Sequence, residues 1–299
     1  MNNQLLRILV AAVGIPLALL AVWYGGLPLA LLIAVVGGVG AGEFFRLVEP
    51  TGVQPLKPLG ITLAALAPLI TWVQAAPVAD RIGPFDSFVA ALLSPLWYYT
   101  PWLLAAMLLP LIILTAVLFR RAAGQKPIAS AATTLLGTLY AGMLPCSLLL
   151  IRYEAGSQQS WAATWLVFFP LAITWVCDSI AMYAGKAFGK TKLWPAVSPG
   201  KTQVGSVAGV IGGVVAGLVF NAVALAPVGR AFPTVPVIMM GLVISIVAQL
   251  GDLVESLFKR EAGVKDSSGL IPGHGGVLDR LDSLYFVLPV AAVMYRMFE

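Results

Sequence analysis

Apolar segments long enough to cross a lipid bilayer recur along nearly the whole of this chain. A transmembrane helix needs ~20 largely apolar residues. Hydrophobic residues make up 60% of the chain and charged residues only 10%, a composition that excludes an ordinary soluble domain. We therefore predict an all-α, polytopic integral membrane protein with about nine transmembrane helices.

The predicted spans cover residues 8–24, 28–46, 59–76, 102–119, 130–151, 161–184, 204–226, 235–257 and 284–298. The apolar segment 85–99 is short and contains Pro95, so we expect it to be interfacial or re-entrant. Cys146 and Cys177 both fall within apolar segments, and nothing indicates a disulfide.

We expect a single integral membrane domain over residues 1–299. Residues 1–160 would form N-terminal transmembrane helices, and residues 161–299 would carry the catalytic helices. Two long polar loops, 185–203 and 258–283, would connect helices of the second part. These two loops hold most of the unusual chemistry of the sequence.

Basic residues indicate the orientation in the membrane. With a cytoplasmic N-terminus, the outer segments would hold Arg81, Arg152, Arg230 and Arg296, and the inner segments the other 14 of the 18 basic residues. The positive-inside rule favours this orientation, with both polar loops inside. The net charge of +5 then reflects topology, and we expect no nucleic-acid partner.

Glycines are frequent in several spans, for example from Gly37 to Gly42 and from Gly205 to Gly217. Small residues allow helices to pack closely in membranes. Such contacts occur within one chain or in a homodimer, and the sequence leaves both open.

The stretch from Gly251 to Ser283 gathers six acidic and four basic residues, together with the single histidine of the chain, His274. Charges at a membrane boundary cost desolvation energy, so a dense set of both signs usually serves a site. Four acidic residues lie at the predicted inner ends of four different spans, and they are Glu43, Asp178, Asp252 and Asp279. They would share one membrane depth.

Helical spacing brings some of these residues onto common faces. Asp252, Ser256 and Lys259 follow i, i+4, i+7 spacing. Asp279 and Asp282 are i, i+3 at the start of the last helix, where the helix dipole also favours acids without any functional role. Carboxylates from facing helices suit Mg²⁺, and neighbouring Lys and Arg suit phosphate, so the set is typical of phosphoryl-transfer chemistry.

The loop 185–203 includes Gly200-Lys201-Thr202, but it is no Walker motif, because Pro195 stands where that pattern requires glycine and we expect no preceding strand. Ser198, Lys201 and Thr202 beside helix N-terminal amides could still hold phosphates. The alternative is an ordinary basic inner loop. His274 lies in a glycine-rich turn and lacks zinc-binding partners, so a phosphate contact or a turn-ordering role is the better interpretation.

One long run carries a resemblance to a known family. It reads Ser256-x-x-Lys259-Arg260-x4-Lys265-Asp266, followed by Pro272-Gly-His-Gly-Gly276-x-x-Asp279-Arg280-x-Asp282. This pattern resembles the signature of phosphatidate cytidylyltransferases, also called CDP-diacylglycerol synthases. The similarity extends over 178–205, whereas the N-terminal half agrees only in being several apolar spans.

The resemblance implies the reaction CTP + phosphatidic acid → CDP-diacylglycerol + pyrophosphate in the cytoplasmic (inner) membrane, with the active site on the cytoplasmic face. It also implies Mg²⁺ dependence, with a second cation left open. The metal carboxylates would be Asp252 and Asp279. Further residues of the polar site would be Asp178, Ser256, Lys259, Arg260, Lys265, Asp266, His274, Arg280 and Asp282, with Ser198, Lys201 and Thr202 on substrate phosphates. Lys259, Arg260, Lys265 and Asp282 are counted with the two metal carboxylates as catalytic.

Two positions depart from the family pattern. Val204 stands where an acidic residue is usual, and Gly200 replaces a residue that is often polar or basic. Two other hypotheses remain. A proton-coupled transporter would use Glu43 and Asp178 as ion relays, although no internal repeat supports it. The same chemistry could also act on another lipid, such as an isoprenoid phosphate or an ether lipid.

Overall fold

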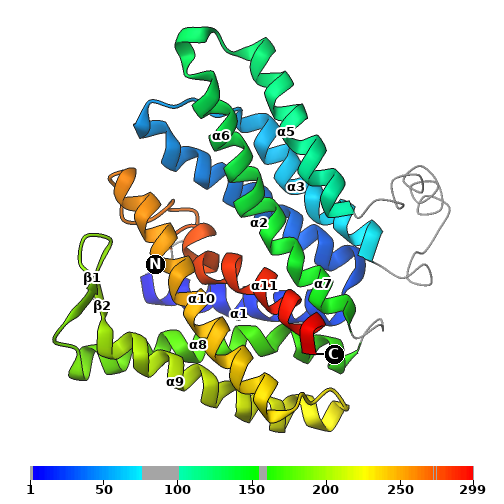
Figure 1. Cartoon of the computed structure of the whole chain (residues 1–299), viewed down its shortest axis with the longest axis vertical. Coiled ribbons are helices and arrows are strands. Elements are labelled where there is room, and N and C mark those ends of the chain that lie inside the picture. The colour runs from blue at the N-terminus through cyan, green and yellow to red at the C-terminus, as the bar shows by residue number, and fades with distance from the viewer. Residues whose placement is uncertain (1–2, 76–100, 155–159, 272, 274, 299) are drawn as a thin grey trace.

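The computed structural model describes residues 3–75, 101–154, 160–271, 273 and 275–298. Its helices are α1 (Asn3–Tyr24), α2 (Gly26–Val48), η1 (Glu49–Thr51), α3 (Lys57–Ala75), α5 (Pro101–Arg120), η4 (Ala123–Gln125), α6 (Pro127–Gly137), η5 (Thr138–Met143), η6 (Leu144–Cys146), α7 (Ser147–Glu154), α8 (Trp161–Phe188), α9 (Gln203–Phe220), η7 (Asn221–Leu225), η8 (Ala226–Val228), α10 (Thr234–Glu261) and α11 (Leu278–Phe298). Figure 1 shows how they are arranged.

Helices dominate the described chain, as the apolar segments predict. Six of them are long and apolar enough to cross a membrane, and they begin at Gly26, Pro127, Trp161, Gln203, Thr234 and Leu278. The protein is therefore an all-α, multi-pass membrane protein. Each of the nine predicted ranges coincides with a helix or a continuous helical run, but the number of spans stays a prediction. The segment 85–99 lies outside the described residues.

One element was not expected from the sequence. Strands β1 (Lys192–Trp194) and β2 (Ser198–Thr202) form an antiparallel hairpin between α8 and α9. The expectation of no strand before Lys201 is thus wrong, because the two strands have only three and five residues, too few to show an alternating apolar pattern in the sequence. The Walker motif remains excluded, because its first glycine is replaced by Pro195, which lies in the turn of this hairpin.

The helices form two groups that meet at α11. Figure 1 shows α2, α3, α5 and α6 in one group and α8, α9, α10 and α11 in the other, while α7 reaches α11. Glycines allow the closest approaches: a Cβ on Gly142 would collide with the backbone of Ala64, and one on Gly209 would lie 2.9 Å from the Cys177 carbonyl oxygen. The small residues in the spans therefore serve helix packing within the chain.

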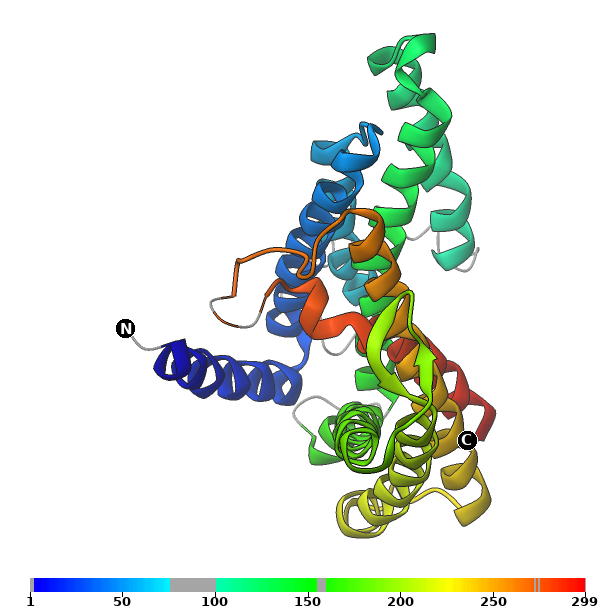
Figure 2. The ribbon, with the colours of Figure 1, turned by 90° about the vertical axis from the view of Figure 1, so that its left-hand side faces the viewer.

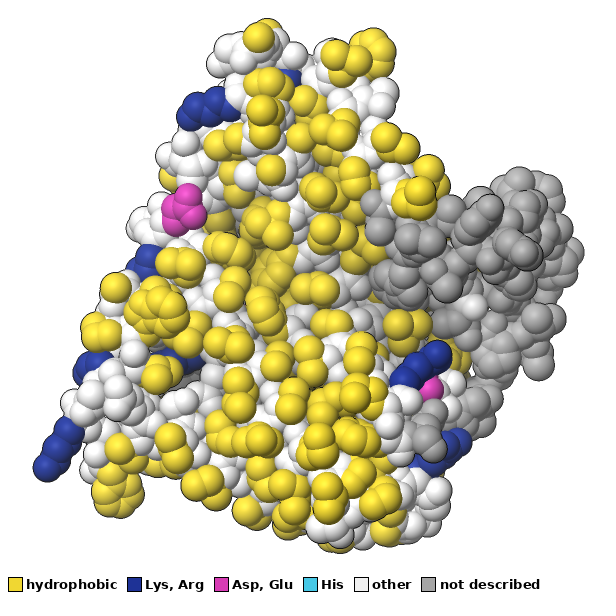
Figure 3. Space-filling model, viewed as in Figure 1, with side chains coloured by type: hydrophobic (Ala, Val, Ile, Leu, Met, Phe, Trp, Pro, Cys, Tyr) yellow, Lys and Arg dark blue, Asp and Glu magenta, His cyan; other side chains and the backbone are white. Residues whose placement is uncertain are grey.

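Apolar side chains cover most of the face shown in Figure 3, and Lys and Arg stand at its margins. Figure 2 shows α1 running outward from the base of α2. Residues such as Ile15, Leu17 and Leu20 are more than half exposed on this helix. Exposed apolar surface on this scale fits contact with lipid tails.

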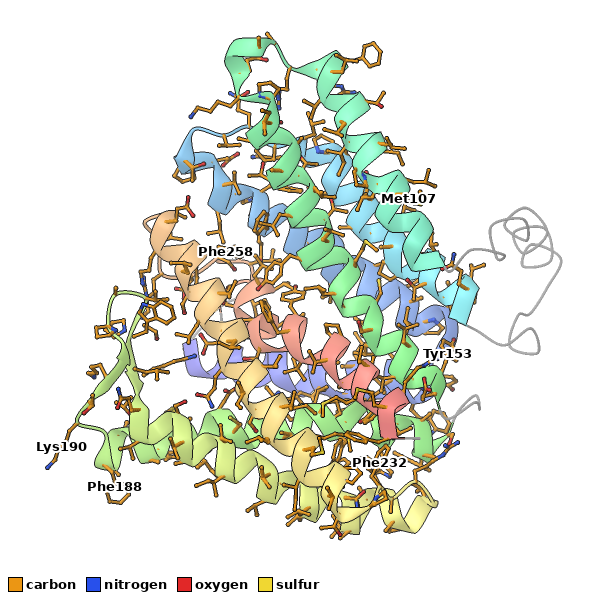
Figure 4. The ribbon with its side chains drawn as sticks, viewed as in Figure 1. Met107, Tyr153, Phe188, Lys190, Phe232 and Phe258 are labelled. Atoms are coloured by element: carbon orange, nitrogen blue, oxygen red, sulfur yellow. The ribbon has the colours of Figure 1, made fainter. Side chains whose placement is uncertain are left out.

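The corner between α1 and α2 depends on a buried arginine. Arg152 of α7 is 0% exposed and donates hydrogen bonds to the carbonyl oxygens of Val22 (2.7 Å) and Trp23 (2.9 Å) at the end of α1. Gly25 adopts a left-handed φ of 65° beside the guanidinium, where a side chain would be strained. Tyr153, which Figure 4 labels at the end of α7, accepts a hydrogen bond from the Gly26 amide. The charged guanidinium therefore donates to carbonyl oxygens at the C-terminus of α1 that have no partner within the helix.

We expect Arg152→Met to destabilise the protein by about 3 kcal/mol, because two buried carbonyls lose a charged donor. Thermal unfolding in detergent measures the effect. Arg296→Met is the matched control: its side chain is 73% exposed in a surface pair with Glu154, and such pairs contribute less than about 1 kcal/mol. Equal unfolding temperatures for the two variants would contradict this account of the corner.

Candidate active site

A cavity of about 920 Å³ lies where the hairpin and α8, α9, α10 and α11 come together. Eight of the residues predicted for the site line it, and they are Asp178, Ser198, Lys201, Thr202, Asp252, Asp279, Arg280 and Asp282. Asp178 and Asp252 lie in the C-terminal halves of α8 and α10, and Asp279, Arg280 and Asp282 lie at the beginning of α11. Ser198, Lys201 and Thr202 belong to β2, directly before α9. Four helix ends that are distant in sequence therefore converge on one polar space.

Asp252 and Lys201 form an ion pair across this cavity. The Lys201 Nζ lies 2.7 Å from the Asp252 Oδ2, and both side chains are about one quarter to one third exposed. Ser256, one turn further along α10, donates to the Asp252 Oδ1 at 3.3 Å. Asp252 and Ser256 thus share a face of α10, as predicted, and Lys201 of the hairpin contacts Asp252 on that face.

Both oxygens of the Asp279 carboxylate accept hydrogen bonds. Its Oδ1 accepts from the Lys259 Nζ at 2.8 Å. Its Oδ2 accepts from the amide of Ser267, the hydroxyl of Ser267 and the amide of Gly276, each at 2.8 Å. Lys259 also pairs with Glu255 at 3.0 Å, so it lies behind the cavity rather than along its wall. The i, i+4 spacing of Glu255 and Lys259 explains this placement.

Other charges of the cavity have no such partner. Asp282 accepts only from the neighbouring Ser283 amide, and neither it nor Asp178 forms a salt bridge within the described part of the chain. In the same part of the chain Lys186, Lys192 and Arg280, which also line the cavity, form no ion pair. Unpaired groups of both signs can bind a ligand that carries phosphates and a cation.

Arg280 also borders a second, smaller pocket. This pocket has a volume of about 530 Å³ and is lined by Lys265, Asp266 and glycines of the loop before α11. The resemblance implies one polar cavity for these residues, and the structure divides them between two adjacent spaces. The reason is that the loop folds back onto Asp279 and separates Lys265 from Asp282. His274 lies outside the described residues.

Arg260 points away from the cavity. Its guanidinium donates to the carbonyl oxygens of Val197 and Val264, each at 3.2 Å. It therefore joins the hairpin turn to the end of α10, and this contact spans 63 residues of sequence. Two donors of its guanidinium thus serve structural hydrogen bonds.

Thr202 begins α9. Its hydroxyl accepts from the Gly205 amide at 3.1 Å and is packed against Gly185 and Gly189 of α8. The residue is only 4% exposed. This hydroxyl thus caps a helix, in the way that Ser and Thr commonly do, whereas Ser198 and Lys201 of the same strand are accessible.

The sequence predicts no role for Gln249, and it indicates Glu43 only as an acid at the inner end of a span and as an ion relay in the transporter hypothesis. The Ser206 hydroxyl donates to the side-chain Oε1 of Gln249 in α10 at 2.5 Å. The main-chain carbonyl oxygen of Gln249 lies 3.5 Å from the Lys201 Nζ. Glu43 of α2 contacts the loop before α11. A glutamine and a glutamate inside apolar helices were the available signals, since buried polar groups need partners.

The donor set fits a magnesium ion that is shared with substrate. In the described residues, no three His, Cys, Asp or Glu side chains are close enough to hold a metal by themselves. Asp178, Asp252, Asp279 and Asp282 nevertheless line one cavity with oxygen ligands only. Mg²⁺ commonly binds through one or two carboxylates and completes its shell with phosphates and water.

Comparison with known proteins identifies the family. A model described as the cytidylyltransferase family matches residues 5–298. The chain belongs to this family. The cytidylyltransferase match covers both helix groups, including the N-terminal spans that the signature alone did not reach.

Individual cytidylyltransferases are similar over shorter stretches. A phosphatidate cytidylyltransferase of Bacillus subtilis is 41% identical over 133 residues, which are 44% of this chain and 48% of that protein. One from Brucella abortus is 41% identical over 159 residues, 53% of this chain and 54% of the relative. One from Haemophilus influenzae is 40% identical over 147 residues, 49% and 51%. The chain thus matches about half the length of these relatives.

The departure at Val204 can now be located in the structure. Val204 lies in the first turn of α9 and is 44% exposed. It is not among the described residues that line the cavity. The missing carboxylate therefore leaves the arrangement of Asp252, Asp279 and Asp282 unchanged.

Thr202→Val should lower the stability of the protein by about 1 kcal/mol, because it removes the cap of α9 and keeps the volume of the side chain. Thr202→Ser retains the hydroxyl and should stay within a few tenths of a kcal/mol of the wild type. Unfolding in detergent compares the two. A Val variant as stable as the Ser variant would argue that the hydroxyl serves a ligand instead.

Proposed function

We propose that this protein is a phosphatidate cytidylyltransferase of a bacterial inner membrane, which converts CTP and phosphatidic acid into CDP-diacylglycerol and pyrophosphate. The observation that carries the proposal is the cavity at the ends of four helices, where carboxylates and basic groups without an ion-pair partner in the described part of the chain lie together. The names of the relatives from Bacillus, Brucella and Haemophilus support the choice of substrates.

The lining of the cavity suits a lipid that ends in a phosphate. Trp175 and Met182 of α8, with Leu193 of the hairpin, supply an apolar part of its wall. Trp175 and Met182 are 52% and 46% exposed on a lipid-facing helix. The acyl chains of phosphatidic acid would lie along this side, and Lys186, Lys192 and Lys201 would bind phosphate.

The transfer itself needs no covalent enzyme intermediate. A phosphate oxygen of phosphatidic acid attacks the α-phosphorus of CTP in line, and a new P–O bond forms. The bond between the α-phosphorus and the oxygen that bridges to the β-phosphorus breaks, and pyrophosphate leaves with that electron pair. Arg280 and Lys201 would offset the negative charge that develops on the phosphate oxygens, which is the main protein contribution in such reactions.

Magnesium would be held by Asp252 and Asp279, with Asp282 beside them and substrate phosphates completing the shell. When bound, it would neutralise phosphate charge. Lys259 keeps Asp279 oriented through its 2.8 Å bond. Asp282 has an oxygen without a hydrogen bond in the described residues. A second cation, bound by substrate phosphates, stays open.

The site would face the cytoplasm, where CTP is present. The C-terminal ends of α8 and α10 and the beginnings of α9 and α11 meet at the cavity. In the topology predicted from basic residues, all four of these helix ends lie inside. Geometry and charge distribution therefore support the same face.

The proposal is tested with purified protein, phosphatidic acid, Mg²⁺ and each of four nucleoside triphosphates in turn. We expect pyrophosphate and lipid-linked nucleotide with CTP only. Asp282→Asn should lower kcat about 10²- to 10³-fold, because it removes a carboxylate from the proposed site of the magnesium ion that would neutralise phosphate charge, and it affects only one local hydrogen bond.

Glu261→Gln is the matched control, since Glu261 is exposed at the end of α10 and does not line the cavity. Glu261→Gln should retain wild-type kcat. A chelator should abolish the activity of the wild type and of Glu261→Gln until Mg²⁺ is restored. Wild-type rates in Asp282→Asn would rule out the proposed site. Absence of product with every triphosphate would rule out the substrates.

Trp175→Ala should raise KM for phosphatidic acid about fivefold, because an apolar contact of about 1 kcal/mol is lost. KM for CTP should not change. Trp161→Ala, at the other end of α8 and 57% exposed, is the control and should leave both KM values unaltered. Assays in mixed micelles with varied lipid fraction measure both constants. An equal rise for CTP would contradict an acyl-chain role.

A further inference from the structure

Glu43 is a buried carboxylate in an otherwise apolar stretch of α2. It is 2% exposed, and four donors lie within hydrogen-bond distance of its carboxylate: the Ser268 hydroxyl (2.5 Å), the Leu278 amide (2.8 Å), the Val277 amide (3.1 Å) and the Ser267 hydroxyl (3.2 Å). All four donors belong to the loop before α11 or to the first residues of α11. A buried charge is tolerated only when its hydrogen bonds are satisfied.

The donors of Glu43 are interleaved with those of Asp279. The Ser267 hydroxyl lies 2.8 Å from the Asp279 Oδ2 and 3.2 Å from the Glu43 Oε2, and its single proton can serve only one of them at a time. Asp279 also takes the Gly276 amide, and Glu43 takes the next two amides of the chain. Two carboxylates from different helices therefore fasten both ends of the same loop.

This packing leaves no room for a side chain at Gly275 or Gly276, where the loop meets the two carboxylates. A Cβ on Gly276 would lie within 2.6 Å of both Glu43 carboxylate oxygens. Gly275 has a φ of 80°, which L side chains rarely adopt, and its Cβ would lie 2.6 Å from the Asp279 Oδ2. Figure 2 shows this loop, in orange, against α2 in blue. The two glycines thus allow the carboxylates to approach the backbone.

We propose that Glu43 is a positioning residue for the transfer reaction. From α2 it holds the start of α11 and the turn at Ser267, and it thereby fixes the places of Asp279 and Arg280 at the cavity. It does not line the cavity and would touch neither substrate. The proposal rests on the proposed function, and it extends the working site to the N-terminal helix group.

Glu43→Gln tests the proposal, because it keeps the size of the side chain and turns one acceptor into a donor that faces N–H and O–H groups. We expect kcat to fall about 10- to 100-fold, as is typical when a supporting partner of a ligand is lost. KM for CTP and for phosphatidic acid should stay within about twofold. Glu43→Asp retains the charge and should restore part of the rate.

Hydrogen exchange gives a readout that does not need activity. In Glu43→Gln the amides of Ser267, Gly276, Val277 and Leu278 should exchange faster, while those of α8 and α9 keep the wild-type rate. Glu49→Gln is the matched control, because Glu49 follows α2 and its side chain is half exposed in a pair with Lys57. It should change neither exchange nor kcat.

The outcomes separate this inference from the proposed function. Wild-type kcat and wild-type loop exchange in Glu43→Gln would overturn the positioning role. Faster exchange with unchanged kcat would also overturn it and leave a purely structural bond. If Glu43→Gln does not fold, Glu43→Asp decides by the same two measurements. A wild-type protein inactive with every triphosphate would refute the function, and the exchange data would still test the attachment of the loop.

Discussion

The hydrogen bonds to the Asp279 carboxylate hold the polar half of this membrane protein together. One carboxylate joins Lys259 of α10, Ser267 of the loop and Gly276 before α11. A charge buried at a membrane boundary is strongly unfavourable unless donors surround it, and here four donors do. The position where α11 begins, and with it Arg280 and Asp282, follows from this arrangement.

Close helix packing provides the second half of the cavity. Gly185, Gly189 and Gly205 let α8 and α9 approach until the Thr202 hydroxyl fits between them. The hairpin then projects from that contact, and its Lys201 reaches the Asp252 carboxylate on α10. The cavity thus depends both on the small side chains that let the helices pack closely and on the charges of the loops.

Apolar length alone predicts the helices, because the bilayer sets how long each must be. The signature also predicts much of the cavity, since helical spacing brings Asp252 with Ser256 and Asp279 with Asp282 onto common faces. The hairpin and the bond from Arg260 to Val197 could not be predicted, because they depend on contacts between segments far apart in sequence. The same holds for Glu43, which lies more than 220 residues from its donors.

The distribution of polar groups along α10 argues for an enzyme rather than a transporter. In its first half the buried residues are apolar or glycine, apart from the small hydroxyl residue Ser245, and none of them is charged. In its second half they include Gln249 and Glu255, close to the cavity. A transport path would require polar groups near the midplane and toward both ends of the helices. Because the charges of α10 gather at one end, they suit a reaction between a water-soluble phosphate compound and a lipid at one membrane face.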